Sequence, residues 1–85
     1  MDNLKVIFED NKILVVEKPS GIPVQSDSSA VLDLTAICKS YIKEKYNKPG
    51  NVFLGLVHRL DRPVGGIMVF AKNSKSAARL SELIR

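Results

Sequence analysis

Residues 56–66 read Leu56-Val57-His58-Arg59-Leu60-Asp61-Arg62-Pro63-Val64-Gly65-Gly66, and they lie between two apolar runs. These runs, Val52–Val57 and Ile67–Ala71, are each predicted to form a strand. A connection between strands usually carries Asn, Gly or Ser, because the backbone turns tightly there. This connection instead carries two arginines and one carboxylate before its proline and glycines. We therefore expect the chemistry of the protein at this connection.

Strand alternation predicts where the charged side chains point. If the first strand continues over Val52–Leu60, Arg59 and Asp61 project together from one face. Leu60 then anchors the other face in the core, and His58 points away from Asp61 into a core or supporting role. A surface ion pair at a strand end explains the same charges and stabilises little, so these residues alone favour that simpler interpretation.

Two strands are expected near the N-terminus. Leu4, Val6 and Phe8 alternate with other residues and predict a strand with one apolar face. The unbroken run Ile13–Val16 predicts a second strand that is buried on both faces. Lys18–Gly21, with proline second and glycine fourth, fits a type I turn after it.

A helix is predicted in the middle of the chain. Apolar residues at helical spacing place it from Val31 to about Tyr46. Ser28 or Ser29 is expected to cap its first turn, and Lys48-Pro49-Gly50 to end it.

A further strand and helix complete the predicted order. The strand covers Gly66–Lys72, and Asn73 or Ser74 caps a helix whose buried face carries Ala77, Leu80 and Ile84. The fold class is therefore α+β, in the order β-β-α-β-β-α. This last pattern reaches Arg85 without a Gly or Pro, so we expect a piece of a larger α+β protein.

The amino-acid composition limits the cellular compartment, the kinds of site and the partners that the protein can have. Thirteen Lys and Arg against nine Asp and Glu give a net charge of +4, which permits an anionic partner such as nucleic acid without requiring one. The single cysteine, Cys38, excludes an internal disulfide, and with one histidine it cannot build a structural zinc site. No apolar run reaches the roughly 20 residues of a membrane span, and the N-terminus lacks a signal sequence. We expect a soluble, cytoplasmic protein with no membrane partner.

The segment His58-Arg59-Leu60-Asp61-Arg62 closely resembles the signature of the RluA-type pseudouridine synthases. The similarity extends to Glu9–Gly21, which looks like the opening strand and turn of that family, and to Gly66–Lys72 with the helix after it. The resemblance identifies residues 1–85 as the N-terminal part of a catalytic domain that ends within or just after a helix. It begins almost at Met1, so we expect no separate N-terminal RNA-binding domain.

The resemblance implies that uridine is isomerised to pseudouridine in ribosomal or transfer RNA, without a metal or other cofactor. Asp61 would be the catalytic carboxylate, acting as nucleophile or as a charge-stabilising group. The target base must leave its stack, because a stacked base is out of reach. Arg59 would occupy the space near the flipped nucleotide, Arg62 would contact a phosphate, and Lys18 is a turn residue near the site for which RNA contact is the alternative.

The other reactive side chains have simpler interpretations. Cys38 lies in mid-helix on an apolar stripe, so a nucleophilic pair with His58 is not expected. Tyr41 and Tyr46 are expected to pack. The tyrosine and the basic partner of the aspartate come from later segments in this family, so we expect the 85 residues alone to be inactive.

Two rival functions fit the same residues. A noncatalytic RNA-binding module would use Arg59, Arg62 and the lysines only for their charge. A purely structural piece would carry these charges as an ion-paired strand end. In every case, sheet edges or apolar faces left uncovered in so short a piece favour self-association.

Overall fold

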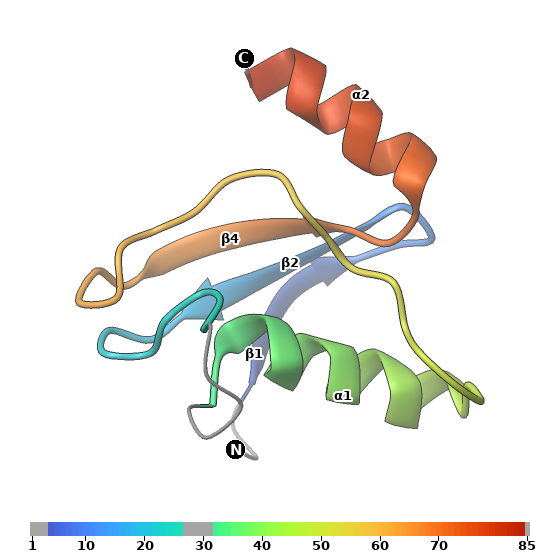
Figure 1. The fold of residues 1–85 in the computed structure, drawn as a ribbon, viewed down its shortest axis with the longest axis horizontal. Coiled ribbons are helices and arrows are strands. Elements are labelled where there is room, and N and C mark those ends of the chain that lie inside the picture. The colour runs from blue at the N-terminus through green and yellow to red at the C-terminus, as the bar shows by residue number, and fades with distance from the viewer. Residues whose placement is uncertain (1–3, 27–31, 85) are drawn as a thin grey trace.

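The computed structural model describes residues 4–26 and 32–84 (Figure 1). Its elements follow the predicted α+β order. In sequence they are β1 (Lys5–Glu9), β2 (Ile13–Lys18), α1 (Leu34–Tyr46), β3 (Gly55–Leu56), β4 (Gly66–Ala71) and α2 (Ser74–Ile84). Neither helix has the length and apolar character needed to cross a bilayer.

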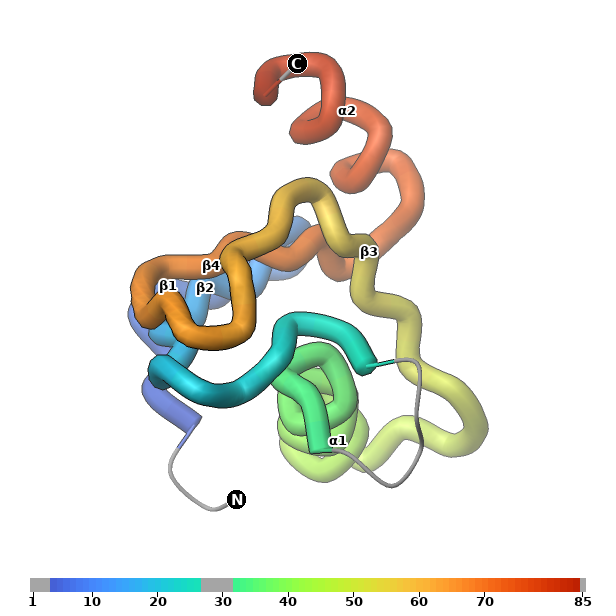
Figure 2. The backbone as a smooth tube through the Cα atoms, turned by 60° about the vertical axis from the view of Figure 1, so that its left-hand side comes forward, coloured from blue at the N-terminus to red at the C-terminus, as the bar shows by residue number. Residues whose placement is uncertain are grey.

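The strands form one antiparallel sheet in the order β1-β2-β4-β3. β4 therefore lies between β2 and the two-residue β3, although β3 precedes it in the chain. The two helices lie on opposite sides of this sheet, and Figures 1 and 2 agree on that arrangement. α2 contacts β3 and β4, so it covers one end of the sheet.

The core lies between the sheet and α1. Alternate residues of the two central strands face α1, so one face of β2 is fully buried and the other is only half-buried. The fully buried hydrophobic side chains here are Leu14, Val16, Met68 and Phe70 from the strands, with Leu34, Cys38 and Ile42 from α1. The expectation that β2 is buried on both faces is therefore correct for one face only.

A β-bulge in β1 changes which residues face the core. Val6 pairs with Val16 and Phe8 pairs with Val15, so Ile7 is the extra residue. A bulge of this kind shifts the alternation that follows it. Phe8 is consequently 50% exposed, and the prediction that it shares an apolar face with Val6 is wrong.

α1 ends at Tyr46 as predicted, whereas its first residue, Leu34, and its cap differ from the prediction. Its N-cap is Asp33, whose carboxylate accepts the backbone N–H of Ala36 at 2.7 Å. Its C-cap is Asn47, in the left-handed region (φ 51°), immediately before the predicted stop at Lys48. Asp33 supplies the cap because a side-chain oxygen there reaches the free N–H groups of the first turn. The residues predicted to begin or cap the helix, Ser28, Ser29 and Val31, lie outside the described residues.

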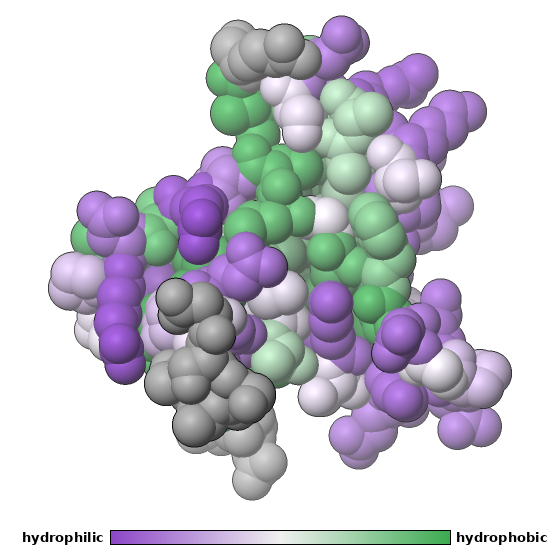
Figure 3. All heavy atoms as spheres, in the orientation of Figure 1, coloured by the Kyte–Doolittle hydropathy of each residue, from purple (hydrophilic) through white to green (hydrophobic). Residues whose placement is uncertain are grey.

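α2 packs more loosely than α1. Asn73 caps it as expected, since its side-chain oxygen accepts the N–H of Ser76 at 2.8 Å. A Cβ atom at Gly55 would lie 2.9 Å from the Cβ of Ala77, so the glycine permits the close approach of helix and sheet. Ile84, predicted to be buried, is 54% exposed because the helix extends beyond the sheet. Figure 3 shows apolar surface running from α2 onto the middle of the molecule.

Candidate active-site loop

The connection between β3 and β4, residues 57–65, leaves the sheet after two paired residues. Gly55 and Leu56 pair with β4, and the next contact with that strand comes from a side chain: Nε2 of His58 accepts the backbone N–H of Val69 at 3.1 Å. The imidazole thus takes the place of a strand carbonyl. The predicted strand through Leu60 is therefore wrong, because His58 satisfies β4 while the backbone moves away.

Leu60 and His58 face the protein, whereas their charged neighbours do not. Leu60 is half-buried and packs against the core. Gly66, which begins β4, makes room for it, since a Cβ there would lie 3.2 Å from Cδ1 of Leu60. Arg59 and Asp61 are both exposed, so Leu60 fixes the segment at a point between two outward-facing charges.

Lys18 holds the loop from within. Its side chain is 0% exposed, although it carries an ammonium group. The Nζ donates to the carbonyls of Arg62 at 2.9 Å, Val64 at 2.6 Å and Pro19 at 3.2 Å. These three carbonyl dipoles replace the water molecules that the ammonium group loses on burial. The geometry does not agree with direct RNA contact by Lys18, because its charged end is enclosed by the backbone it supports.

The turn after Lys18 and the loop also pair directly. The N–H of Gly21 donates to the carbonyl of Arg62 at 2.8 Å, and Nε of Arg62 donates to the carbonyl of Gly21 at 3.2 Å. A Cβ at Gly65 would lie 3.2 Å from the carbonyl oxygen of Lys18, so the two segments are in close contact. Two motifs about forty residues apart in the sequence therefore form one unit.

Asp61 is the first residue of the turn in this unit. Its backbone carbonyl accepts the N–H of Val64 at 2.9 Å and closes the turn. Within residues 4–26 and 32–84 its carboxylate makes no hydrogen bond or ion pair, so the ion pair with Arg59 is not formed there. An exposed carboxylate on a well-held turn is free to act on a bound group, as a nucleophile or as a compensating charge.

Other candidate chemistry is weaker in the described part of the chain. Burial raises the pKa of the Cys38 thiol to about 12, so it is a poor nucleophile. No cluster of three or more His, Cys, Asp or Glu among the described residues is suited to hold a metal ion.

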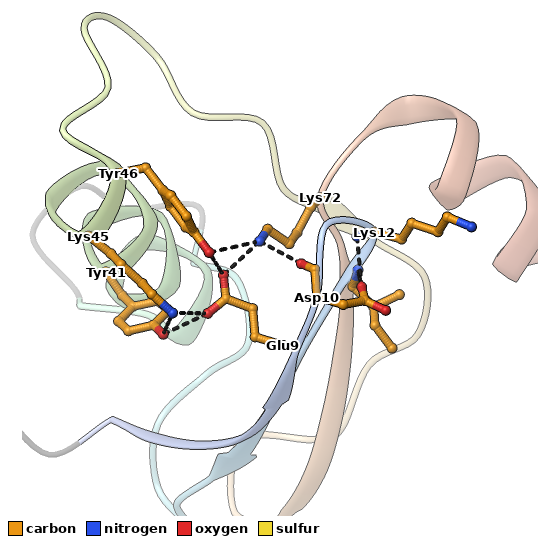
Figure 4. A network of polar contacts seen from close by, with 8 residues as sticks. Glu9, Asp10, Lys12, Tyr41, Lys45, Tyr46 and Lys72 are labelled. Carbon is orange, nitrogen blue, oxygen red and sulfur yellow. Dashed lines mark hydrogen bonds and ion pairs between the residues drawn. The ribbon is translucent and has the colours of Figure 1, made fainter.

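Sequence reasoning missed a cluster around Glu9, which we call the Glu9 network (Figure 4). The bulge in β1 turns the Glu9 carboxylate inward, where its side chain is 6% exposed. Four donors surround it: Tyr41 at 2.7 Å, Lys45 at 2.9 Å, Tyr46 at 2.7 Å and Lys72 at 2.6 Å. Tyr41 and Tyr46 therefore do more than pack. The network joins β1, α1 and the residue after β4.

The network also sets the ionisation of its members. Burial raises the pKa of Glu9, but the hydrogen bonds from Lys45, Lys72 and the two tyrosines outweigh it and hold this pKa well below its usual value. The hydrogen bond to Glu9 raises the pKa of Lys45 in turn. No signal in the sequence pointed to this cluster, because it depends on the bulge.

Known proteins are similar to this chain over most of its length. Residues 12–85 match the profile of the family described as RNA pseudouridylate synthase. The chain is 37% identical over 81 residues to ribosomal large subunit pseudouridine synthase C of Buchnera aphidicola from Acyrthosiphon pisum, covering 95% of this chain and 24% of that protein. It is 32% identical over 87 residues to an uncharacterized RNA pseudouridine synthase of Mycoplasma genitalium, covering 99% of this chain and 27% of the relative.

A solved structure shows the same fold. Human RNA Pseudouridylate Synthase Domain Containing 4 superposes with a TM-score of 0.78 at 30% identity, covering 95% of this chain and 29% of the human one. The chain thus spans about a quarter of the length of the curated relatives it matches.

Proposed function

Because this chain belongs to the RNA pseudouridylate synthase family, we propose that the protein isomerises uridine to pseudouridine in RNA, with Asp61 at the reaction centre. The observation that carries this proposal is the exposed carboxylate of Asp61, on a turn held by Lys18 and without a partner in the described part of the chain.

The reaction breaks the bond between C1′ of the ribose and N1 of uracil and forms a bond between C1′ and C5. The proton leaves C5 and N1 gains one, so the product is an isomer of the substrate. Asp61 lowers the barrier either by adding to the sugar or ring or by stabilising the positive charge that develops as the base departs. Both roles require an unpaired carboxylate that reaches an extruded nucleotide.

The neighbouring arginines contribute to RNA binding in this proposal. Arg59 is exposed beside Asp61, and its planar guanidinium stacks on bases near the flipped nucleotide. Arg62 uses Nε to hold Gly21, which leaves its terminal nitrogens for a phosphate. Lys18 becomes a positioning residue, because it sets the loop that carries Asp61.

The name of one relative supports a class of substrate. The Buchnera relative is named for the ribosomal large subunit, so we propose ribosomal RNA as the first substrate to test, with transfer RNA as the second. We also propose that residues 1–85 supply the carboxylate but not the whole pocket, so that they have no turnover alone.

The test replaces Asp61 by asparagine in the protein at its full natural length. Turnover is measured as tritium release from RNA labelled at C5 of uridine, and folding by circular dichroism. We expect Asp61→Asn to lose turnover and keep its fold, while Glu82→Gln, which neutralises an exposed acid on α2, keeps both. Full turnover by Asp61→Asn removes Asp61 from the reaction. RNA binding without any product from the unaltered protein favours the noncatalytic RNA-binding module instead.

A further inference from the structure

A small hollow lies between the β1–β2 turn and the start of α2, away from the candidate active-site loop. Its volume is about 210 Å³. Six side chains line it: Asn11, Lys12, Asn73, Lys75, Ser76 and Arg79. We call this feature the basic hollow, because three of its six residues are cationic.

The three cations are not held by short contacts within the described residues. In the part of the chain that the structure describes, the charged groups of Lys12, Lys75 and Arg79 make no hydrogen bond or ion pair, and all three residues are exposed. Figure 4 shows Lys12 extending away from the Glu9 network. The carboxylate of Asp10 accepts the backbone N–H groups of Ile13 and Lys12, which lowers its pKa, and the charge of Lys12 contributes to this lowering. One carboxylate leaves an excess of positive charge, which favours an anion.

The basic hollow and Asp61 lie toward opposite ends of the same strand pair. β2 and β4 pair over six positions, from Ile13 opposite Ala71 to Lys18 opposite Gly66. Lys12 precedes the first position, and Lys18 holds the active-site loop at the last. At about 3.4 Å per residue, the ladder separates the two regions by about 17 Å. A ligand that reaches both regions must therefore span at least about 17 Å and carry negative charge at the basic hollow.

We propose that the basic hollow binds backbone phosphates of the substrate RNA at a distance from the modified uridine. This inference rests on the proposed function, which supplies the RNA. Lysine and arginine on exposed stems bind phosphates without reading the bases, so the basic hollow adds affinity and orientation but no sequence preference.

The experiment compares two triple variants of the full-length protein with the same change in charge. One removes the basic hollow by Lys12→Gln, Lys75→Gln and Arg79→Gln. The matched control, Lys39→Gln, Lys43→Gln and Lys48→Gln, removes exposed and unpaired lysines of α1 and the turn after it. Fluorescence anisotropy gives the Kd for a labelled ribosomal RNA segment over a series of KCl concentrations, and tritium release gives kcat and KM.

We expect loss of the basic hollow to reduce the slope of log Kd against log salt by about 2, since each lost contact to a single strand removes about 0.7. KM rises while kcat stays unchanged, because these contacts are the same in the ground and transition states. The control triple keeps the slope of the unaltered protein. If the triple variant folds poorly, Lys75→Gln and Arg79→Gln made singly are each expected to reduce the slope by about 0.7.

The results separate the two proposals. If the unaltered protein forms product and both triple variants keep its salt slope, the basic hollow is overturned and the proposed function is not. An equal loss in both triples also overturns it, because the effect then comes from overall charge. Absence of product from the unaltered protein overturns the proposed function.

Discussion

Replacing Lys18 by methionine removes the buried ammonium and keeps a side chain of similar length. Three carbonyls lose a hydrogen bond, but they are not equally affected. The carbonyl of Arg62 keeps the N–H of Gly21 at 2.8 Å. Those of Val64 and Pro19 have no other donor among the described residues. The substitution therefore leaves two acceptors unsatisfied.

The magnitude follows from these two acceptors. Each unsatisfied buried group costs about 1–3 kcal/mol, which gives at most about 2–6 kcal/mol for the pair. Both hydrogen bonds are part-buried and Val64 is 44% exposed, so water reaches these carbonyls and the cost lies in the lower half of that range. Removing a cation from the interior returns part of its desolvation cost. We therefore expect Lys18→Met to lower the free energy of unfolding by about 2–4 kcal/mol. Urea unfolding measures this change, with Lys39→Met, at an exposed position of α1, as the matched control.

Turnover tests whether Lys18 also positions Asp61. Under conditions where the variant remains folded, we expect kcat to fall at least about tenfold, because small displacements of a catalytic group are costly. Unchanged stability in Lys18→Met would refute the conclusion that Lys18 holds the loop. Reduced stability with normal kcat would show that Lys18 supports the fold without setting the position of Asp61.

Three further predictions concern other parts of the molecule. The pKa of Glu9 is held below its ordinary value of 4.5, so the stabilisation of the fold by the ionised Glu9 is present at neutral pH and is lost as the pH falls below that value. The urea midpoint of the natural protein is therefore expected to fall between about pH 6 and pH 3, and that of Glu9→Gln is expected to change less. Gly55→Ala is expected to cost about 1–3 kcal/mol by overpacking against the Cβ of Ala77, and adding Ala77→Gly is expected to restore part of the thermal stability. Cys38 is fully buried, so we expect iodoacetamide to label it at the rate of unfolding, and rapid labelling of the native protein would contradict the described packing of α1.

The sequence predicted those features that depend on local pattern. The order of the elements and the α+β class are confirmed by the structure and its likeness to the human protein. Sequence pattern was enough to predict the apolar run of β2, the helical stripe of α1 and the cap at Asn73, because each depends on residues close together in the chain. Asp61 is exposed and Leu60 is half-buried, as the alternation predicted, although these residues do not form the strand on which that prediction was based.

What remained hidden depends on residues far apart in the chain. Lys18 was predicted to be a turn residue near the site, and its burial could not be seen because its carbonyl partner at Val64 is 46 positions away. His58 was placed in a predicted strand, whereas its ring replaces a backbone partner of Val69. Local propensity describes neither contact, since both are decided by tertiary packing.

The extra residue Ile7 has a consequence for how β1 can vary in length. Deleting Ile7 would restore plain alternation and leave its neighbours on their present faces, because Val6 would stay opposite Val16, Phe8 opposite Val15 and Glu9 opposite Leu14. A β1 strand shorter by this one residue would therefore keep Glu9 among its four donors, without altering any residue of the loop that carries Asp61. Differences in length among natural homologues are therefore expected at Ile7 and in the exposed turn around Asn11.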